Sequence, residues 1–364
     1  MDEPADVKEE ASPESDPEYA RLRKHWRIYR PEELKQECAR TGQNFIIEGL
    51  IPERSLGLIV GDSGIGKSPL AYQMAMCVAA GVPFLGLRTQ QARVLYLDYE
   101  NGLQDVNAML TRLATYLGLS TPPPELILWN INDCPDDWGQ AGRDFLDLIR
   151  DVKPGLVFFD PLSAVHPTIE RTNGEAGLFY KLLRGAIRKY GCPIINLHHP
   201  KKQTDPRSGK PLVRQSIEDE PSPRTWFAQA RGPGVLVNGV DVRLGVDLPG
   251  ISGAGQSDIA LVVRGYSRVR GEIPTIHLAR VLDPAGEPLG YRKATGVDLL
   301  CNQDQQDTFA RLADKFTFKE AKREYGKADQ ATIDFLNKCI AKGILTRVAK
   351  GVYEKVKTSG VTGV

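Results

Sequence analysis

Between residues 45 and 300, short runs of β-branched and other apolar residues alternate with longer segments of helical periodicity. This alternation predicts an α/β fold with a mostly parallel central sheet, because parallel strands are joined through crossover helices. The runs that we interpret as strands are Leu56–Val60, Arg93–Leu97, Leu126–Trp129, Leu156–Asp160, Pro193–His198, Val235–Asn238, Asp258–Arg264 and Thr275–Arg280.

The pattern changes on both sides of this segment. Residues 1–18 hold eight acidic side chains and one lysine, which is typical of a disordered tail. Residues 19–44 are charged and helix-rich, with an interruption expected at Pro31, and we interpret them as a helical arm. Residues 301–357 predict short amphipathic helices followed by a hairpin, in a small α+β domain, and residues 358–364 form a flexible tail. The segment 45–300 itself contains two long loops, from Pro161 to about Gly177 and from Pro200 to Arg231, and loops of this length usually carry function or are disordered.

The composition excludes wholesale disorder, because 41% of the 364 residues are hydrophobic and a full core is available. The longest apolar stretch, Leu70–Leu87, is interrupted by Gln73, Gly81 and Pro83 and predicts a buried helix rather than a membrane span. No secretory pattern opens the chain. The six cysteines show no metal-binding spacing, and we expect buried thiols in a reducing cytosol. These residues are Cys38, Cys77, Cys134, Cys192, Cys301 and Cys339. We therefore expect a soluble, cytoplasmic protein with no membrane partner.

A phosphate-binding loop stands between the first apolar run and a helix. The pattern GxxxxGK[ST] is matched in full by Gly61, Asp62, Ser63, Gly64, Ile65, Gly66, Lys67 and Ser68. Glycines let the backbone amides wrap phosphates, and the following helix adds positive potential at its N-terminus. Lys67 is expected to reach the β- and γ-phosphates, and the Ser68 hydroxyl to ligate Mg²⁺. The sequence therefore predicts binding of ATP with Mg²⁺.

Acidic residues end two of the predicted strands. Asp160 ends the run Leu156–Asp160 and is placed as a Walker B aspartate that holds Mg²⁺ through water. The next residue is Pro161 and not Glu, which argues against the AAA+ class. Glu100 follows another strand and suits a general base that orients the attacking water. A solvated strand-end carboxylate is the alternative for Glu100, and it is the favoured interpretation of Asp98.

Several segments in this order make residues 45–300 resemble a RecA-like ATPase of the branch that contains the DnaB-like replicative helicases. The segments are Phe45–Glu53, Leu97–Asn101, Asp160, Leu197–His199 and Ala230–Gly232. The strongest resemblance is to the small hexameric plasmid RepA helicases and their bacterial and phage relatives. It implies a hexamer with nucleotides between subunits, and Glu100 as the catalytic base.

The strand that ends in His198 and His199 occupies the position of the γ-phosphate sensor in that family, and we assign this role to His199. A hydrogen-bonded core histidine is the alternative. A paired-histidine metal site is disfavoured, because neighbours on one strand point to opposite faces.

A site between subunits requires a cation from the neighbour. Arg268 and Arg270 resemble the basic pair that DnaB-like rings insert as fingers, and their alternate spacing predicts one face of a strand. An exposed basic edge strand is the alternative. Arg231 is a second candidate for contact with the nucleotide, or else a structural part of the turn and strand that follow it.

Two basic segments are candidates for binding single-stranded DNA. Residues 201–216 carry a charge of +4 and follow the sensor strand, where RecA-like rings place a loop that lines the central channel; the basic side chains are Lys201, Lys202, Arg207, Lys210 and Arg214. A solvated mobile loop is the alternative.

Residues 301–364 carry 12 basic and 8 acidic side chains. Thr317 to Glu320 is a capping box that opens a short helix closed by Gly326. The second helix, Asp329–Ala341, is predicted to bury Ile333, Leu336 and Ile340. The hairpin after it completes a winged-helix-like pattern. Polar residues of this second helix and its end are expected to be exposed for DNA or protein contact: Gln330, Thr332, Asn337, Lys338 and Lys342.

Together these features predict an oligomeric, hexameric ATPase that translocates on DNA or unwinds it in replication. A RecA-fold switch or recombination mediator that loads other proteins without unwinding is one alternative. A nucleotide-regulated DNA-binding protein is another. The near-neutral charge of +1 is a balance between an acidic tail and two basic surfaces, which permits DNA binding that depends on salt and on assembly.

Overall fold

The structure is a computed structural model. It describes residues 16–26, 28–41, 44–130, 138–166, 168–202, 214–250, 259–268, 270–294, 298, 300, 303–341 and 344–356. The chain divides into two compact units, residues 1–44 and Phe45–Val364. Almost all of the two predicted tails lies outside the described residues, and the domain boundaries drawn from the sequence stay predictions.

The first unit contains two helices, α1 (Pro17–Trp26) and α2 (Pro31–Thr41). Pro31 begins the second helix, where its missing N–H leaves no hydrogen bond unmade. Ion pairs from Arg23 to Glu33 and from Arg30 to Asp16 tie the two helices together. The prediction that all cysteines are buried was wrong for Cys38, which is exposed on α2, whereas Cys77, Cys192 and Cys339 are buried.

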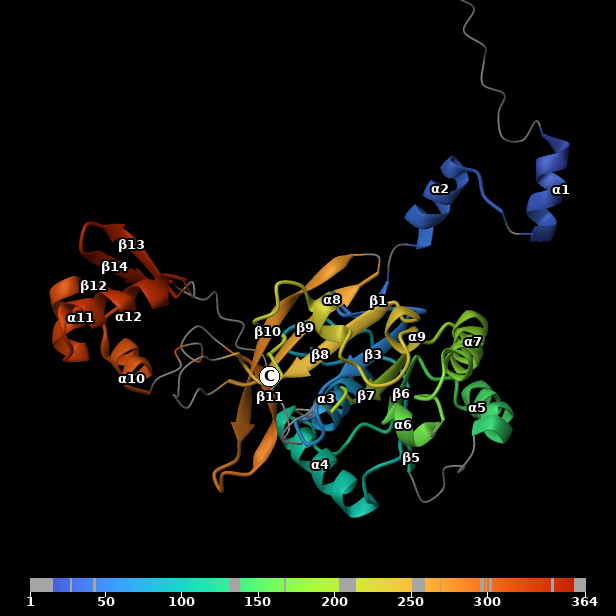
Figure 1. The fold of residues 1–364 in the computed structure, drawn as a ribbon, viewed down its shortest axis with the longest axis horizontal. Helices are drawn as coiled ribbons and strands as arrows, with labels where there is room; N and C mark the ends of the chain where they lie inside the picture. The colour runs from blue at the N-terminus through green and yellow to red at the C-terminus, as the bar shows by residue number, and fades with distance from the viewer. Residues whose placement is uncertain are drawn as a thin grey trace, which may run out of the picture. The chain divides into compact units, whose positions relative to one another are not determined.

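The second unit is built on a nine-stranded sheet with the order β11-β10-β9-β8-β3-β7-β6-β4-β5 (Figure 1). The strands are β3 (Leu56–Val60), β4 (Val94–Asp98), β5 (Leu126–Asn130), β6 (Leu156–Asp160), β7 (Ile194–His198), β8 (Val242–Asp247), β9 (Ile259–Ser267), β10 (Gly271–Leu282) and β11 (Pro288–Lys293). Strands β8, β3, β7, β6, β4 and β5 are parallel, and β9, β10 and β11 extend the sheet in antiparallel fashion. The predicted mostly parallel sheet is thus confirmed.

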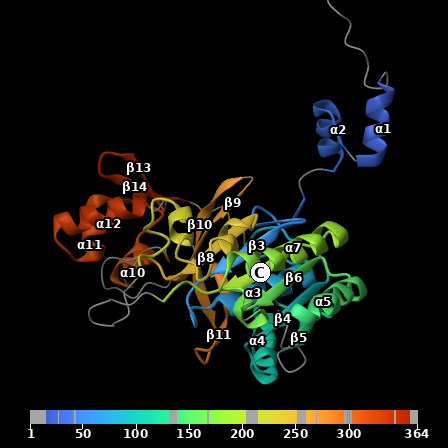
Figure 2. The same cartoon turned by 45° about the vertical axis from the view of Figure 1, so that its right-hand side comes forward.

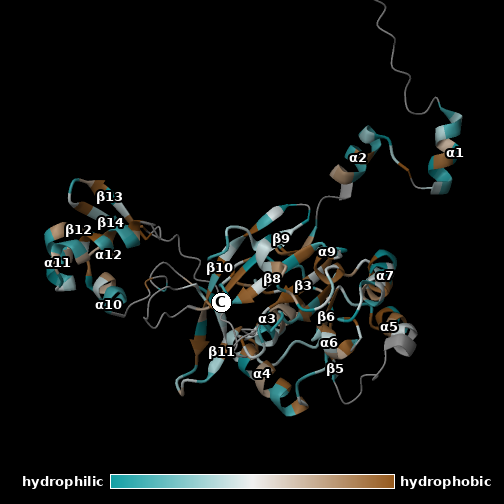
Figure 3. Ribbon diagram, viewed as in Figure 1, coloured by the Kyte–Doolittle hydropathy of each residue, from teal (hydrophilic) through white to brown (hydrophobic). Residues whose placement is uncertain are grey.

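Helices cover both faces of this sheet. One core lies under α3 (Lys67–Ala80) and α4 (Leu103–Tyr116). The opposite core lies under α5 (Trp138–Val152), α6 (Leu162–Val165), α7 (Asn173–Tyr190), α8 (Pro223–Phe227) and α9 (Val235–Asn238), with α5 and α7 side by side (Figures 1 and 2). The parallel strands are hydrophobic along their length (Figure 3), as expected for strands buried on both faces. A short ribbon of β1 (Phe45–Ile47) and β2 (Ile51–Pro52) precedes the sheet.

Two predictions about this unit were wrong. The run Val235–Asn238 is the helix α9 and not a strand, and the strand of this region is β8, which begins at Val242. A run of three apolar residues is too short to separate helix from strand by periodicity. The segment predicted as a loop from Pro161 to Gly177 contains α6 and the first turn of α7, whose N-cap is Thr172.

The C-terminal part of the second unit has its own core. Its elements are α10 (Gln303–Arg311), β12 (Lys315–Thr317), α11 (Phe318–Tyr325), α12 (Asp329–Ala341), β13 (Leu345–Ala349) and β14 (Val352–Lys355), with the strand order β12-β14-β13. The predicted capping box of Thr317 and Glu320 is confirmed, and Gly326 ends α11 with a φ of +65°. The two helices and the hairpin expected here are therefore present.

The buried face of α12 differs from the prediction. Ile333 is 39% exposed, whereas Phe335, Leu336 and Cys339 are buried against the hairpin side of this core. Thr332, predicted to be exposed, is completely buried and donates a hydrogen bond to the carbonyl of Ala328. The buried face of α12 therefore includes Thr332 in place of the predicted Ile333. Thr332 can face the core because its hydroxyl is hydrogen-bonded within the helix.

Among the helices of the described part, none is long and apolar enough to cross a membrane.

Candidate nucleotide site

The predicted site residues lie at the carboxyl ends of the parallel strands, at one edge of the sheet. The loop Gly61–Gly66 follows β3, and β7 lies between β3 and β6, which ends in Asp160. Gly61 donates a backbone hydrogen bond to the carbonyl of His198, which ties the start of the loop to the end of β7. In open α/β sheets this edge is where ligands bind.

The turn of the loop depends on glycine. Gly64 has a φ of +73° and Gly66 a φ of +117°, values that other residues rarely adopt. A Cβ atom at Gly66 would also collide with the hydroxyl of Tyr291 on β11, so this strand packs directly against the phosphate loop. A cavity of about 260 Å³ lies beside Gly64 and Gly66, and its other walls include Met109, Arg112 and Arg280.

Lys67 opens α3 and is only 5% exposed. Its Nζ donates to the carbonyl of Asp62 at 2.7 Å and lies 3.4 Å from Nδ1 of His199. Burial lowers the pKa of Lys67, and the nearby carboxylates of Asp160 and Glu100 oppose that shift. The ammonium is thus held over the loop by neutral groups, with the strand-end carboxylates close to it.

Asp160 and Ser68 form the oxygen-rich part of the site. Asp160 is 1% exposed and accepts hydrogen bonds from the hydroxyls of Tyr96, at 2.7 Å, and Ser68. Burial raises the pKa of Asp160 to about 6, and the two hydroxyls act in the opposite direction. A hydroxyl and a carboxylate in contact are hard oxygen donors of the kind that Mg²⁺ prefers, so these residues fit that ion.

Asp98 ends β4 directly beside Asp160 of β6 and serves a different purpose. It accepts hydrogen bonds from the Tyr72 hydroxyl at 2.6 Å, from the backbone N–H groups of Glu100 and Asn101, and from the Asn101 side chain. This network fixes the backbone that carries Glu100, whose side chain is exposed at the edge of the sheet. Asp98 is 1% exposed, so its interpretation as a solvated strand-end carboxylate was wrong, and it acts as a positioning residue.

Tyr72 and Tyr96 were not singled out in the sequence. Their rings stack with centroids 3.9 Å apart, and each donates to one of the two buried aspartates. The sequence held one indication of a role for Tyr96. Tyr96 and Asp98 are two residues apart on one strand and therefore lie on the same face.

The two histidines after β7 have different partners. His199 faces Lys67, and burial together with the Lys67 charge lowers its pKa to about 4. His198 is completely buried and its Nε2 donates to the carbonyl of Arg231 at 2.7 Å, which leaves Nδ1 as an acceptor. Burial likewise lowers the pKa of His198 to about 4. Among the described residues there is no cluster of three or more His, Cys, Asp or Glu that could hold a metal ion.

Glu170, from the loop after α6, was also missed in the sequence. Its Oε2 pairs with Nε of Arg231 at 2.7 Å, and its Oε1 lies 3.9 Å from Nδ1 of His198. Oε1 of Glu170 and Nδ1 of His198 have no hydrogen-bond partner in the described part of the chain. Arg231, predicted to contact the nucleotide, is thus half exposed and paired with Glu170, while its backbone N–H donates to the carbonyl of His199.

This site is defined by three features: the phosphate loop after β3, Asp160 at the end of β6, and Glu100 after β4. A GxxxxGK[ST] loop between a strand and a helix, at the carboxyl edge of a mostly parallel sheet, is the arrangement of a P-loop nucleotide site. Residues 30–205 match a family model described as an AAA domain. No curated protein matches the chain by sequence.

Two solved structures have a similar fold. The RadB recombinase is 17% identical, and the match covers 72% of this chain and 97% of that one with a TM-score of 0.41. A KaiC-like protein from the hyperthermophilic archaeon Pyrococcus horikoshii OT3 is 12% identical, with coverage of 69% and 94% and a TM-score of 0.41.

Arg214 has a structural role in the ATPase core, which corrects its prediction as a DNA contact. Its side chain is 10% exposed and pairs with Asp62 at 2.9 Å and with Asp247 at 3.3 Å. Its guanidinium also stacks on the ring of Trp226, 4.7 Å from the centroid. The sequence showed Arg214 only as one of several charges in a basic loop, because Asp62 and Asp247 are distant from it in the chain.

Arg268 and Arg270 lie in the turn between β9 and β10 and not on a strand, so the predicted shared strand face was wrong. Ser267 pairs with Val242, the first residue of β8, which places this turn at the amino edge of the parallel strands. Strand β8 of the ATPase core spans six residues, or roughly 20 Å, between the two edges. Neither arginine therefore lies beside the phosphate loop of its own chain.

The remaining predicted DNA contacts are only partly described. Lys201 and Lys202 follow the sensor strand and are exposed. Lys338 is half-buried on α12 and its Nζ donates to Gln305 at 3.4 Å. Arg207, Lys210 and Lys342 lie outside the described residues.

Proposed function

We propose that this protein is an oligomeric, hexameric ATPase that acts on DNA, as a helicase or translocase that couples hydrolysis at subunit interfaces to movement. The observation that carries the proposal is that the nucleotide-site residues and the pair Arg268 and Arg270 lie at opposite edges of the sheet. The residues suited to bind and hydrolyse ATP meet at the carboxyl edge, and the arginine pair lies at the other edge, where only a neighbouring copy would meet it.

At the carboxyl edge each residue has a distinct role in phosphoryl transfer. The amides of the loop Gly61–Gly66 and the ammonium of Lys67 bind the phosphates, and Glu100 orients the attacking water. Mg²⁺, held by Ser68 and Asp160, would neutralise charge on the phosphate oxygens when bound. His199, in contact with Lys67, is placed to respond when a γ-phosphate draws that ammonium away.

The cavity beside Gly64 and Gly66 is suited to the base and ribose. It adjoins the phosphate loop, and its walls combine apolar side chains with Arg112 and Arg280. Ligand cavities of this composition are common, because apolar walls hold a ring and a few polar groups orient it.

Arg268 and Arg270 are proposed to complete the site of the neighbouring subunit. Arg268 donates to the carbonyl of Asn238 at 2.6 Å, and Arg270 lies over the ring of Phe45, 4.1 Å from its centroid. Arg268 also lies 3.9 Å from Asp241. A guanidinium stays protonated in such surroundings and offers a planar fork of donors to a phosphoryl group. An arginine supplied in trans is worth about 10³ or more in turnover.

DNA contact is proposed for Lys201 and Lys202 and for the C-terminal part, whose order of helices and strands is that of a winged helix. The alternatives are a mediator that loads other proteins without unwinding and a nucleotide-regulated DNA-binding protein. Strand displacement, ATP hydrolysis with and without single-stranded DNA, and molar mass with and without ATP distinguish the three. A monomer under all conditions would contradict the shared site.

The interface mechanism has a sharper test in mixed oligomers. Arg270→Ala should reduce turnover by about 10³ while sparing nucleotide affinity, since its own phosphate loop is intact. Mixing Arg270→Ala with Lys67→Ala subunits should restore part of the activity, because some interfaces then combine an intact loop with an intact arginine. Mixtures whose activity is only the sum of the two inactive proteins would contradict a finger in trans.

A further inference from the structure

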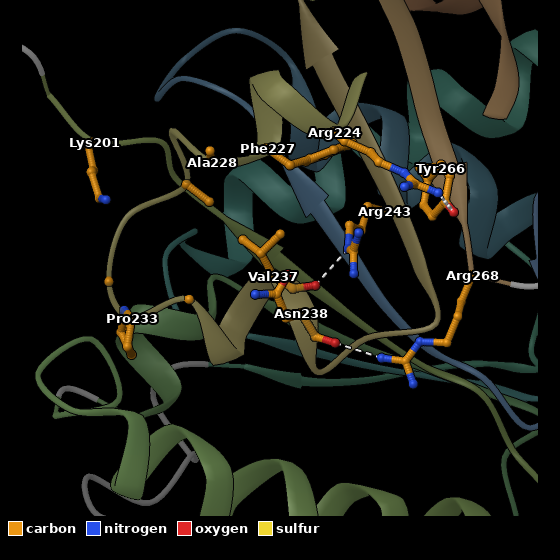
Figure 4. Close-up of a pocket in the computed structure, with 13 residues that line it drawn as sticks. Lys201, Arg224, Phe227, Ala228, Pro233, Val237, Asn238, Arg243, Tyr266 and Arg268 are labelled. Atoms are coloured by element: carbon orange, nitrogen blue, oxygen red, sulfur yellow. Dashed lines mark hydrogen bonds between the residues drawn. The ribbon is translucent and has the colours of Figure 1, made fainter. Parts of the chain in front are cut away.

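A pocket separate from the phosphate loop lies against the face of β8 and β9, between α8 and α9 (Figure 4). Its volume is about 580 Å³, which is within the range of small-ligand sites. None of the residues that line it belongs to the phosphate loop. Its described lining is strongly basic, with Lys201, Arg224, Arg243 and Arg268, and no Asp or Glu of the described residues contributes to the wall.

Neutral groups hold the three arginines in place. Arg224 stacks on the ring of Tyr266, 4.0 Å from its centroid, and donates to the Tyr266 hydroxyl. Nε of Arg243 donates to the carbonyl of Val237 at 2.6 Å, and Arg268 donates to that of Asn238 at 2.6 Å (Figure 4). These contacts use one or two N–H groups of each guanidinium, and those of Arg224 and Arg243 leave the positive charge uncompensated.

Two of the three arginines, Arg224 and Arg243, lack a carboxylate partner among the described residues. Within the described residues neither forms an ion pair, whereas neighbouring arginines do: Arg184 pairs with Asp241 at 3.1 Å and Arg264 with Glu272 at 3.3 Å. Arg268 lies 3.9 Å from Asp241, a carboxylate already engaged by Arg184.

The cations also act on one another. Burial lowers the pKa of Arg243, and the positive charges of Arg268 and Arg224 lower it further. Arginines that repel one another around a cavity are stabilised when an anion enters it. A phosphate group fits this demand, because it carries up to two negative charges and several acceptor oxygens that guanidinium forks bind in pairs.

We propose that this pocket binds a phosphate group, as an anion site distinct from the ATP site. The occupant is either a phosphodiester of a single-stranded nucleic acid or the phosphate of a free small molecule. Gly232, in the pocket wall, directly follows Arg231, whose N–H donates to the carbonyl of His199. An anion bound here would thus lie next to the segment that is hydrogen-bonded to His199, the residue after β7. The nucleic-acid case rests on the proposed action on DNA, and the free-phosphate case does not.

Arg224→Ala tests the site, because Arg224 is exposed and its replacement should not affect folding. Arg188→Ala is the matched control, an exposed arginine on α7 that does not line the pocket. Both variants and the wild type are saturated with a non-hydrolysable ATP analogue, so that the phosphate loop is filled. Fluorescence anisotropy then measures the affinity for oligo(dT) at several salt concentrations, and phosphorus NMR measures the affinity for inorganic phosphate.

Arg224→Ala should weaken at least one probe about tenfold, because a charge-assisted hydrogen bond to phosphate is lost, while Arg188→Ala stays within about twofold. A loss for oligo(dT), with the salt slope reduced by about 1, identifies a phosphodiester as the occupant. A loss for inorganic phosphate alone identifies a small phosphate-bearing ligand. If neither probe separates Arg224→Ala from Arg188→Ala, the inference is overturned. A wild type that hydrolyses no ATP would refute the proposed function and leave this test valid, since neither probe needs turnover.

Discussion

The nucleotide site and the arginine pocket lie in one core but balance their charges differently. At the nucleotide site the charged groups have partners within the chain: Asp98 and Asp160 accept hydrogen bonds from Tyr72 and Tyr96. In the arginine pocket Arg224 and Arg243 have no carboxylate partner in the described part of the molecule, as set out above. The comparison teaches that the first site is built to hold a catalytic geometry, whereas the second retains charge for a ligand.

The strongest test of the nucleotide site is Lys67→Ala. ATP hydrolysis should fall by about 10³, because a preorganised cation is lost from the phosphates. The fold should be retained, since Lys67 contacts the neutral carbonyl of Asp62 and a histidine, and no carboxylate loses an ion-pair partner. Steady-state turnover and thermal unfolding measure the two effects. Lys189→Ala, at an exposed position of α7, is the control, and turnover within tenfold of wild type would remove Lys67 from the mechanism.

Glu100→Gln separates chemistry from binding at the same site. Turnover should fall by about 10², since the base that orients water is lost. Nucleotide affinity should stay unchanged, because the Asp98 network holds the backbone of residue 100 and not its side chain. Glu125→Gln is the matched control, since Glu125 pairs with Arg93 at the opposite edge. Equal loss of turnover in both variants would indicate a general effect of charge.

The buried pair of histidines predicts a dependence of stability on pH. His198 has a pKa near 4 in the folded chain and near 6.5 when exposed, so the unfolded chain binds the extra proton between these values. Stability is therefore complete above about pH 6.5 and falls as the pH drops toward 4, by up to about 3 kcal/mol for His198.

Urea denaturation from pH 4 to pH 7 checks this dependence. His198→Asn should flatten the curve by about that amount, whereas His25→Asn, on the exposed surface of α1, should leave it unchanged. A His198→Asn curve with the slope of the wild type would show that protons are taken up elsewhere.

Arg214 sharpens the contrast with Arg224, because Arg214 pairs with two carboxylates, whereas Arg224 has no ion pair among the described residues. Arg214→Ala should lower the free energy of unfolding by roughly 2 kcal/mol, since the buried carboxylate of Asp247 loses its ion-pair partner and keeps only hydrogen bonds from neutral N–H groups. Affinity for oligo(dT) should change less than twofold. Chemical denaturation and anisotropy measure both, and a stable Arg214→Ala that no longer binds DNA would reverse the two assignments.

The sequence predicted the nucleotide site well because its signals are local. The loop Gly61–Ser68 and the acids at positions 100 and 160 follow short β-branched runs, and the carboxyl ends of parallel strands meet at one edge without further information. His199 was assigned as the γ-phosphate sensor from the family resemblance, and its contact with Lys67 comes from the structure. The roles of these residues in hydrolysis stay predictions.

What the sequence did not predict depends on partners that are distant in the chain. Arg214 has its partners in the phosphate loop, at Asp62, and at the end of β8, at Asp247, so the sequence alone could not distinguish it from an exposed basic residue. The arginine pocket combines α8, β8, β9 and the segment after β7, and no spacing in the sequence relates them. Val235–Asn238 became a helix because packing, and not the short apolar run, decides its conformation.

The contact between Lys67 and His199 allows the position of the Lys67 ammonium to be followed through the resonances of the histidine ring. The chain has five histidines, so a histidine-labelled sample gives few imidazole signals, and one of them comes from a ring 3.4 Å from the catalytic ammonium. Its nitrogen resonances would report each step that moves Lys67, in solution and without a modified nucleotide. The proposed cycle of ATP hydrolysis can thus be followed by magnetic resonance at a residue that the fold already supplies.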